Sequence, residues 1–147
     1  MSGQVCSDLE WNELAEQNYR TALQINPNDS AAYVGLGVLC RKRGDLDGAM
    51  QYYQRAVALN PKGAQAYSSM AIIEMKRSND RKALEYAEKA SKLDSKDATL
   101  AANLAVAYHY NNRIADRDRM CAEAERLGYR GLDSVQAIFR GEKSMRD

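Results

Sequence analysis

The chain has 147 residues, the size of one ordinary domain, which leaves no room for a catalytic domain beside an accessory one. Its 21 lysines and arginines nearly cancel its 20 aspartates and glutamates, so the net charge of +1 gives no general attraction to nucleic acid or to an anionic membrane. The longest uncharged apolar stretch, Ala31 to Cys40, is about half as long as a membrane-spanning helix. We therefore expect no nucleic-acid partner and no membrane span.

The first predicted element is a helix from Trp11 to Ile25, which supplies the second half of a helical hairpin. The residues ahead of it, Met1 to Leu9, are too few for the first half and carry no secretory signal pattern. Two outcomes stay open for this end of the chain. Either Val5, Trp11 and Leu14 form an exposed interface that pairs with another copy or with further sequence, or the first residues fold as a short cap over Trp11.

A complete helical hairpin is predicted next, over residues 30–63. An amphipathic first helix is indicated by four residues at positions i, i+3, i+4 and i+7, namely Tyr33, Leu36, Gly37 and Cys40. Asp45 is placed to cap a second helix. The inner face of that helix would carry Leu46, Ala49, Met50, Tyr53, Ala56 and Val57.

The hairpin recurs over residues 64–97 and 98–131, with a period of 34 residues. One column holds alanine in four successive periods, a coincidence of roughly one in two thousand on composition alone: Ala22, Ala56, Ala90 and Ala124. Two columns of small residues let antiparallel helices approach closely: Gly37, Ala71 and Ala105, and Ala15, Ala49 and Ala83. Another column holds residues that tolerate the left-handed backbone of a helix end: Gly44, Ser78 and Asn112.

A final helix is predicted within residues 132–144, from an apolar stripe formed by Leu132, Val135, Ile138 and Phe139. Its other face is polar. Because the last hairpin of a repeat array would otherwise expose its stacking face, we expect this element to be a capping helix.

The chain resembles the tetratricopeptide repeat family over residues 11–131. The residues that carry the resemblance stand at the family's signature spacing in the best repeat: Tyr33, Leu36, Gly37, Gly44, Ala49, Tyr53, Ala56 and Pro61. Arg117 replaces a small residue, which makes the last repeat degenerate. The resemblance implies an all-α fold, a right-handed α-solenoid of helix-turn-helix repeats in one domain over residues 1–147. Its parts would be a half repeat at 11–29, repeats at 30–63, 64–97 and 98–131, and the capping helix at 132–144.

The resemblance also implies a function, which is to hold a peptide or a partner helix in a concave groove lined by the first helices of the repeats. The expected groove residues are Val34, Val38, Arg41, Lys42, Ser68, Ile72, Met75, Lys76, Asn103, Val106, His109 and Tyr110. Five cations form what we call the basic rim: Arg41, Lys42, Arg43, Lys76 and Arg77. Either the basic rim attracts a segment with acidic and apolar side chains, or these cations only complement the carbonyl ends of their helices.

Catalysis is not expected. His109 is the only histidine, and the sequence has no glycine-rich phosphate loop and no cluster with metal-ligand spacing, so we predict no catalytic, cofactor-binding or metal-binding residues. The three cysteines stand 34 and 81 residues apart, which favours reduced thiols and a cytoplasmic protein. The prediction is a non-catalytic adaptor or scaffold for a protein partner. The alternatives are a structural or homo-oligomerisation module that acts through its exposed end, and a regulatory domain of a larger protein.

Overall fold

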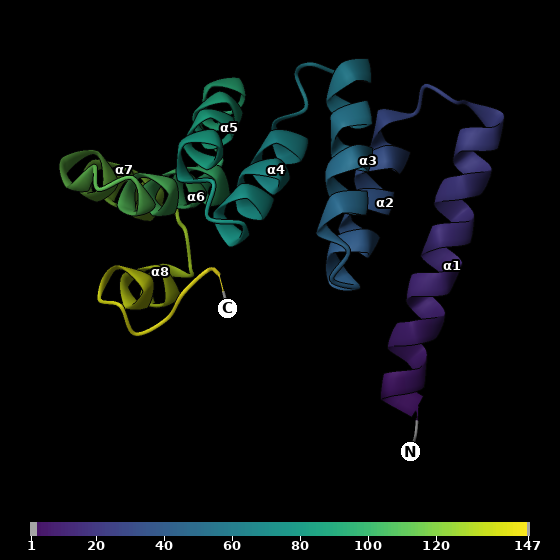
Figure 1. Cartoon of the computed structure of the whole chain (residues 1–147), viewed down its shortest axis with the longest axis horizontal. Helices are drawn as coiled ribbons and strands as arrows, with labels where there is room; N and C mark the ends of the chain where they lie inside the picture. The colour runs from purple at the N-terminus through teal and green to yellow at the C-terminus, as the bar shows by residue number, and fades with distance from the viewer. Residues whose placement is uncertain (1–2, 147) are drawn as a thin grey trace. The chain divides into compact units, whose positions relative to one another are not determined.

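The computed structural model describes residues 3–146, with side chains from Glu10 onward, and over these residues it has eight helices and no strand (Figure 1). The helices are α1 (Gly3–Ile25), α2 (Ser30–Lys42), α3 (Leu46–Leu59), α4 (Ala64–Lys76), α5 (Asp80–Leu93), α6 (Ala98–Tyr110), α7 (Ile114–Arg126) and α8 (Leu132–Phe139). The chain divides into two compact units, unit 1 up to Pro61 and unit 2 from Lys62 onward. The predicted all-α fold class is confirmed.

In unit 1, small residues allow neighbouring helices to pack closely. A Cβ atom placed on Gly37 of α2 would lie only 2.6 Å from a ring carbon of Tyr53, which is fully buried on α3. A Cβ atom on Gly35 would lie 2.3 Å from the ring of Tyr19 on α1. The prediction that Gly37 stands at a close helix crossing is therefore confirmed, and Gly35 has the same role toward α1.

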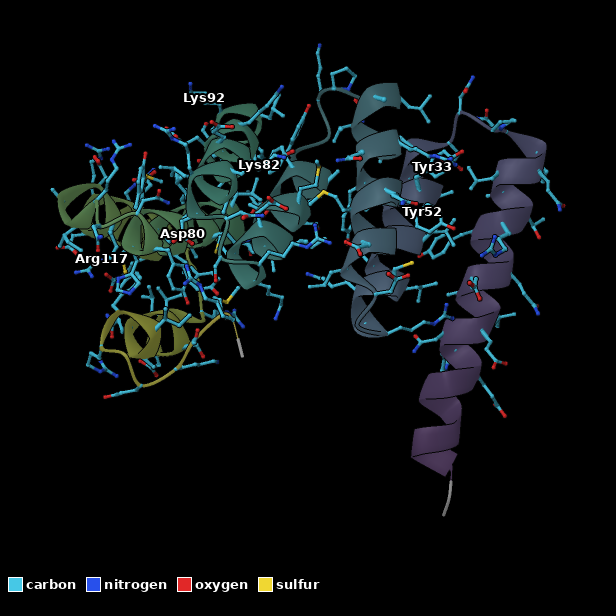
Figure 2. All side chains as sticks on the ribbon, in the orientation of Figure 1. Tyr33, Tyr52, Asp80, Lys82, Lys92 and Arg117 are labelled. Carbon is cyan, nitrogen blue, oxygen red and sulfur yellow. The ribbon has the colours of Figure 1, made fainter. Side chains whose placement is uncertain are left out.

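Side-chain contacts repeat with the sequence period inside each unit. The rings of Tyr33 on α2 and Tyr52 on α3 have centroids 6.2 Å apart (Figure 2), and those of Tyr67 on α4 and Tyr86 on α5, one period later, are 6.4 Å apart. A cation stands over the first ring of each pair, Arg55 in unit 1 and Lys89 in unit 2. Equivalent positions thus make equivalent contacts.

The turn that follows α2, α4 or α6 has the left-handed residue that the sequence predicts. Gly44, Ser78 and Asn112 have φ angles of 82°, 63° and 58°. Each donates its N–H to the carbonyl three residues earlier, and the next residue donates to the carbonyl five residues before it, the pair of bonds that defines a Schellman motif. Asp45 then caps α3 by accepting the N–H of Gly48 at 2.9 Å, as predicted.

The core of unit 2 forms around α6, which packs against α4, α5, α7 and α8. Alanines at these crossings are almost completely buried, among them Ala71, Ala83, Ala105 and Ala124. The helix α8 buries Val135 and Ile138 against this core, as expected of a capping helix. Small side chains keep the backbones of unit 2 close together.

Two expected boundaries are wrong. The first helix begins at Gly3 instead of Trp11 and leaves Trp11 68% exposed, so the first residues do not form a short cap over Trp11. The last helix ends at Phe139 and does not continue to residue 144. It ends there because Gly141, at φ 76°, closes another Schellman motif. Residues 140–146 then run back along α8 toward the end of α4 (Figure 1).

Candidate functional site

The helices α4 and α6 of unit 2 pack against each other and carry eight of the predicted groove residues. We call this region the α4–α6 face: Ser68, Ile72, Met75, Lys76, Asn103, Val106, His109 and Tyr110. The amide of Asn103 donates to the hydroxyl of Ser68 at 2.8 Å, which links the two helices directly. Met75 and Val106 are buried within the core of unit 2, so they support the face from below. Ile72 is half-buried and can contact a ligand.

One end of this face, at Lys76 and Tyr110, is in contact with the chain's own 140–146 segment. Lys76 Nζ donates to the carbonyl oxygen of Met145 at 3.3 Å, and the Tyr110 hydroxyl accepts the N–H of Met145 at 2.9 Å. Arg146 forms an ion pair with Asp80 and lies over the Tyr110 ring, 4.3 Å from its centroid. Side chains predicted to line a groove therefore hold a peptide segment in this structure.

His109 lies next to this contact, and its imidazole already interacts with other side chains. Its Nδ1 lies 3.1 Å from Nη1 of Arg117, and its ring lies 5.1 Å from that of Phe139. Burial lowers the pKa of His109, and the positive charge of Arg117 lowers it further. A neutral imidazole that accepts a hydrogen bond from Arg117 explains this geometry, because arginine has no acceptor atom. A cavity of about 290 Å³ lies between His109, Tyr110 and residues 141–144.

In unit 1, the predicted groove residues lie on α2. Val34, Val38 and Arg41 are half-buried, and Lys42 is exposed. All four residues lie on α2, so within unit 1 they form the face of a single helix.

Three cations of the basic rim have acceptors within their own unit. Arg43 donates two hydrogen bonds to the carboxylate of Glu16, at 3.2 and 3.3 Å, and this bidentate pair lowers the pKa of Glu16. Arg77 lies 3.7 Å from the buried carboxylate of Glu74, and Lys76 bonds to Met145. An acidic partner would have to compete with these contacts, which leaves Arg41 and Lys42 as the better candidates to meet one.

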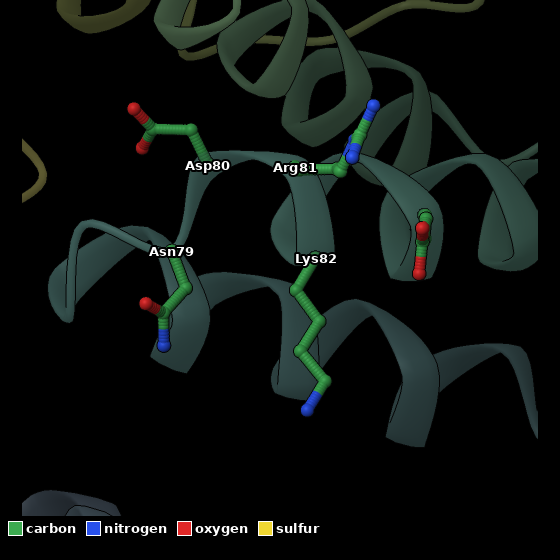
Figure 3. A pocket seen from close by; sticks show the side chains of 5 residues that line it. Asn79, Asp80, Arg81 and Lys82 are labelled. Carbon is green, nitrogen blue, oxygen red and sulfur yellow. The ribbon is translucent and has the colours of Figure 1, made fainter.

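Asp80 is a site residue that the sequence did not indicate. At the first position of a helix an acidic residue is ordinary, because it favours the positive end of the helix dipole. A cavity of about 550 Å³ at this place is lined by Asn79, Asp80, Arg81, Lys82 and Glu85. The Asp80 side chain points away from those of Asn79 and Lys82 (Figure 3). That orientation lets Asp80 reach Arg146, 66 residues away in sequence. No local pattern encodes a contact of that separation.

The predicted end interface lies on α1. Trp11 is 68% exposed and Leu14 is 48% exposed, and the side chain of Val5 lies outside the described residues. Two large apolar side chains one turn apart therefore face solvent on the same helix.

Among the described residues, no cluster of three or more histidine, cysteine or carboxylate side chains could hold a metal ion. Over the same residues, the helices are too short or too polar to cross a bilayer.

Comparison with known proteins agrees with the repeat pattern. Residues 10–64 match the family model described as tetratricopeptide repeat. This match and the helical repeat fold support a protein of the tetratricopeptide repeat family. Such repeats generally mediate protein–protein interaction, and the family typically supplies interaction modules and not catalysts. A search of curated protein sequences finds no match.

Two solved structures have a similar fold. The tetratricopeptide repeat domain of Arabidopsis OM64 superposes with a TM-score of 0.68 at 18% identity, over 78% of this chain and 96% of that one. The crystal structure of MamA superposes with a TM-score of 0.74 at 16% identity, over 100% of this chain and 87% of that one. At these identities the likeness establishes the fold alone.

Proposed function

We propose that the chain is a non-catalytic adaptor that binds a segment of a partner protein on the α4–α6 face of unit 2. The observation that carries the proposal is a pair of hydrogen bonds to the backbone of Met145, from its N–H to Tyr110 and from Lys76 to its C=O. Backbone groups are common to all peptides, so a face that holds them in one segment is suited to hold them in another. Ile72 adds a half-buried apolar contact on the same face.

The proposal is tested by capture of partners with cross-linking from the native cell. Ile72→Glu places a charge on the α4–α6 face, whereas Gln136→Glu places the same charge on an exposed position of α8 and serves as the matched control. We expect wild type and Gln136→Glu to capture the same proteins and Ile72→Glu to lose them. If a folded Ile72→Glu variant, checked by circular dichroism, captures an unchanged set, the α4–α6 face is not the binding site.

On unit 1, the α2 face suits an acidic and apolar segment. Val34 and Val38 supply apolar contact there, and Arg41 and Lys42 supply positive charge beside them. The Arg41→Glu/Lys42→Glu variant should slow association with such a partner and make it less sensitive to salt, because exposed charges act mainly on the encounter rate. An association rate that is unchanged at low salt would refute this assignment.

A second candidate function is self-association through α1. The exposure of Trp11 and Leu14 favours it, since large apolar side chains at adjacent turns are commonly covered by a partner. Sedimentation of the wild-type chain should then show a concentration-dependent dimer that Trp11→Ala abolishes. A monomer at all concentrations would refute self-association and leave partner binding as the proposed function.

We also propose that the protein works in the cytoplasm. Cys40 and Cys121 are free and half-buried, and burial raises the pKa of both thiols, which keeps them protonated and slow to oxidise. A reducing compartment suits such thiols. Mass spectrometry of the protein from its native cell, with rapid thiol alkylation, should find both cysteines alkylated, and oxidised cysteines would argue against this location.

A further inference from the structure

The 140–146 segment is held by unit 2 in the manner of a bound peptide. At Met145 both backbone hydrogen-bonding groups are taken by side chains that project from two helices, Lys76 at the end of α4 and Tyr110 at the end of α6. The Ser144 hydroxyl accepts the N–H of Arg146 at 3.0 Å and lies 3.4 Å from the Tyr110 hydroxyl. The two bonds to Met145 fix the backbone and carry no selection among side chains.

Selection for an apolar residue comes from the core beneath the segment. The Met145 side chain is half-buried and packs against the hydrophobic core of unit 2. A charged side chain at this position would lose its hydration without gaining a partner. The site therefore favours an apolar residue where Met145 stands.

Selection for a cation comes from two groups that meet the next residue. The guanidinium of Arg146 pairs with the carboxylate of Asp80 and also covers the ring of Tyr110, and both charged side chains are about 30% exposed. A carboxylate and an aromatic face together fit a planar cation better than any neutral or acidic side chain. An arginine is therefore favoured directly after the apolar residue.

The segment is tied to unit 2 by only a few partly exposed contacts, which makes it exchangeable. It follows the Schellman motif at Gly141, so it leaves α8 without extending that helix. Its advantage over an external segment is its tether, which raises its local concentration. An external segment with the same contacts competes once that advantage is reduced.

We propose that Lys76, Tyr110 and Asp80 form a recognition site for a short segment with an apolar residue followed by arginine, and that residues 144–146 occupy it as an intramolecular ligand. The occupant that must displace them is a segment of a partner protein with the same apolar–arginine pattern. This inference rests on the proposed function and names the chemistry of the partner. It differs from the acidic preference expected from the basic rim, because Asp80 reverses the charge at this end of the α4–α6 face.

The test uses the full chain and a labelled peptide with the sequence of residues 140–147, acetylated and amidated at its ends. Arg146→Glu places a negative charge against Asp80 and so releases the segment from the site. Measured by fluorescence anisotropy, the Arg146→Glu chain should bind the peptide roughly tenfold more tightly than wild type, which corresponds to the loss of one competing charged contact. Arg146→Gln should give a smaller gain in the same direction.

Two controls separate recognition from a general loosening of the fold. A peptide in which glutamate replaces the arginine should bind the Arg146→Glu chain poorly. The double variant Asp80→Arg/Arg146→Glu restores the ion pair with reversed charges, and its affinity for the original peptide should fall to the wild-type level or below.

Equal binding of the two peptides, or no gain in either Arg146 variant, would overturn the proposal. The proposed function would survive that result if capture of partners still depended on Ile72. Loss of the Ile72 dependence alone would instead refute the proposed function.

Discussion

Gly37→Ala is the change that tests the close crossing of α2 and α3 most sharply. The added Cβ would lie 2.6 Å from one ring carbon of Tyr53 and 2.9 Å from two others. Ordinary contact between carbon atoms requires about 3.5 Å or more, so the ring or the helix must move by roughly 1 Å. Tyr53 is fully buried, and side chains in protein interiors are close-packed, so a shift of its ring displaces neighbouring atoms.

The expected magnitude is the difference of two effects. Overpacking at a rigid core site costs about 1–3 kcal/mol. Alanine in place of glycine inside a helix stabilises the fold by up to about 1 kcal/mol. We therefore expect Gly37→Ala to lower the free energy of unfolding of unit 1 by about 1–2 kcal/mol.

Urea unfolding followed by circular dichroism, with amide exchange of α2 and α3 to isolate unit 1, measures this change. Ala58→Gly, at an exposed position of α3, reports helix propensity alone. In a Tyr53→Leu background the cost of Gly37→Ala should shrink, because the clashing ring is gone. A stabilised Gly37→Ala protein, or a cost that is the same with and without the Tyr53→Leu substitution, would refute the packing argument.

Three further predictions follow from the turns, the caps and the one histidine. Ser78→Gly should stabilise unit 2 by up to about 1 kcal/mol in thermal unfolding, because Ser78 has a φ of 63° and glycine adopts that conformation without a Cβ penalty. Asp45→Ala should destabilise unit 1 by about 1 kcal/mol, since it removes the cap on the Gly48 N–H, and Asp45→Asn should retain most of the stability. His109 has a lowered pKa in the fold, so the unfolded chain takes up its proton first: its contribution to stability is full above its usual pKa of 6.5 and falls as the pH drops below that value. His109→Gln should reduce the change of the urea midpoint with pH between about pH 7 and pH 5. An unchanged pH dependence would show that His109 does not titrate in this way.

Local and periodic features of the fold could be predicted from the sequence. The columns that contain Gly37 and Ser78 have a fixed spacing, and each imposes a local demand, close approach in one case and left-handed backbone in the other. The tyrosine pairs were not predicted, although Tyr52 and Tyr86 stand one period apart. Repetition turns such local demands into a readable pattern.

The contacts of the 140–146 segment could not be predicted, because they occur once. Gly141 ends α8 early, but a single glycine does not indicate where the following chain goes. The pairing of Arg146 with Asp80 joins residues 66 positions apart, and neither residue belongs to a repeated column. The start of α1 at Gly3 was missed for a related reason, since the residues before Trp11 lack a regular apolar stripe.

The central claim is that one site in unit 2 holds either residues 144–146 or a partner segment. Heteronuclear NOE values for the backbone amides of residues 144–146, measured by NMR on the full chain, test it directly. In the chain without added peptide, these amides should be as rigid as those of α8. A saturating excess of unlabelled 140–147 peptide should make them mobile. Amides that are mobile without peptide, or that stay rigid while the peptide binds, would contradict the claim.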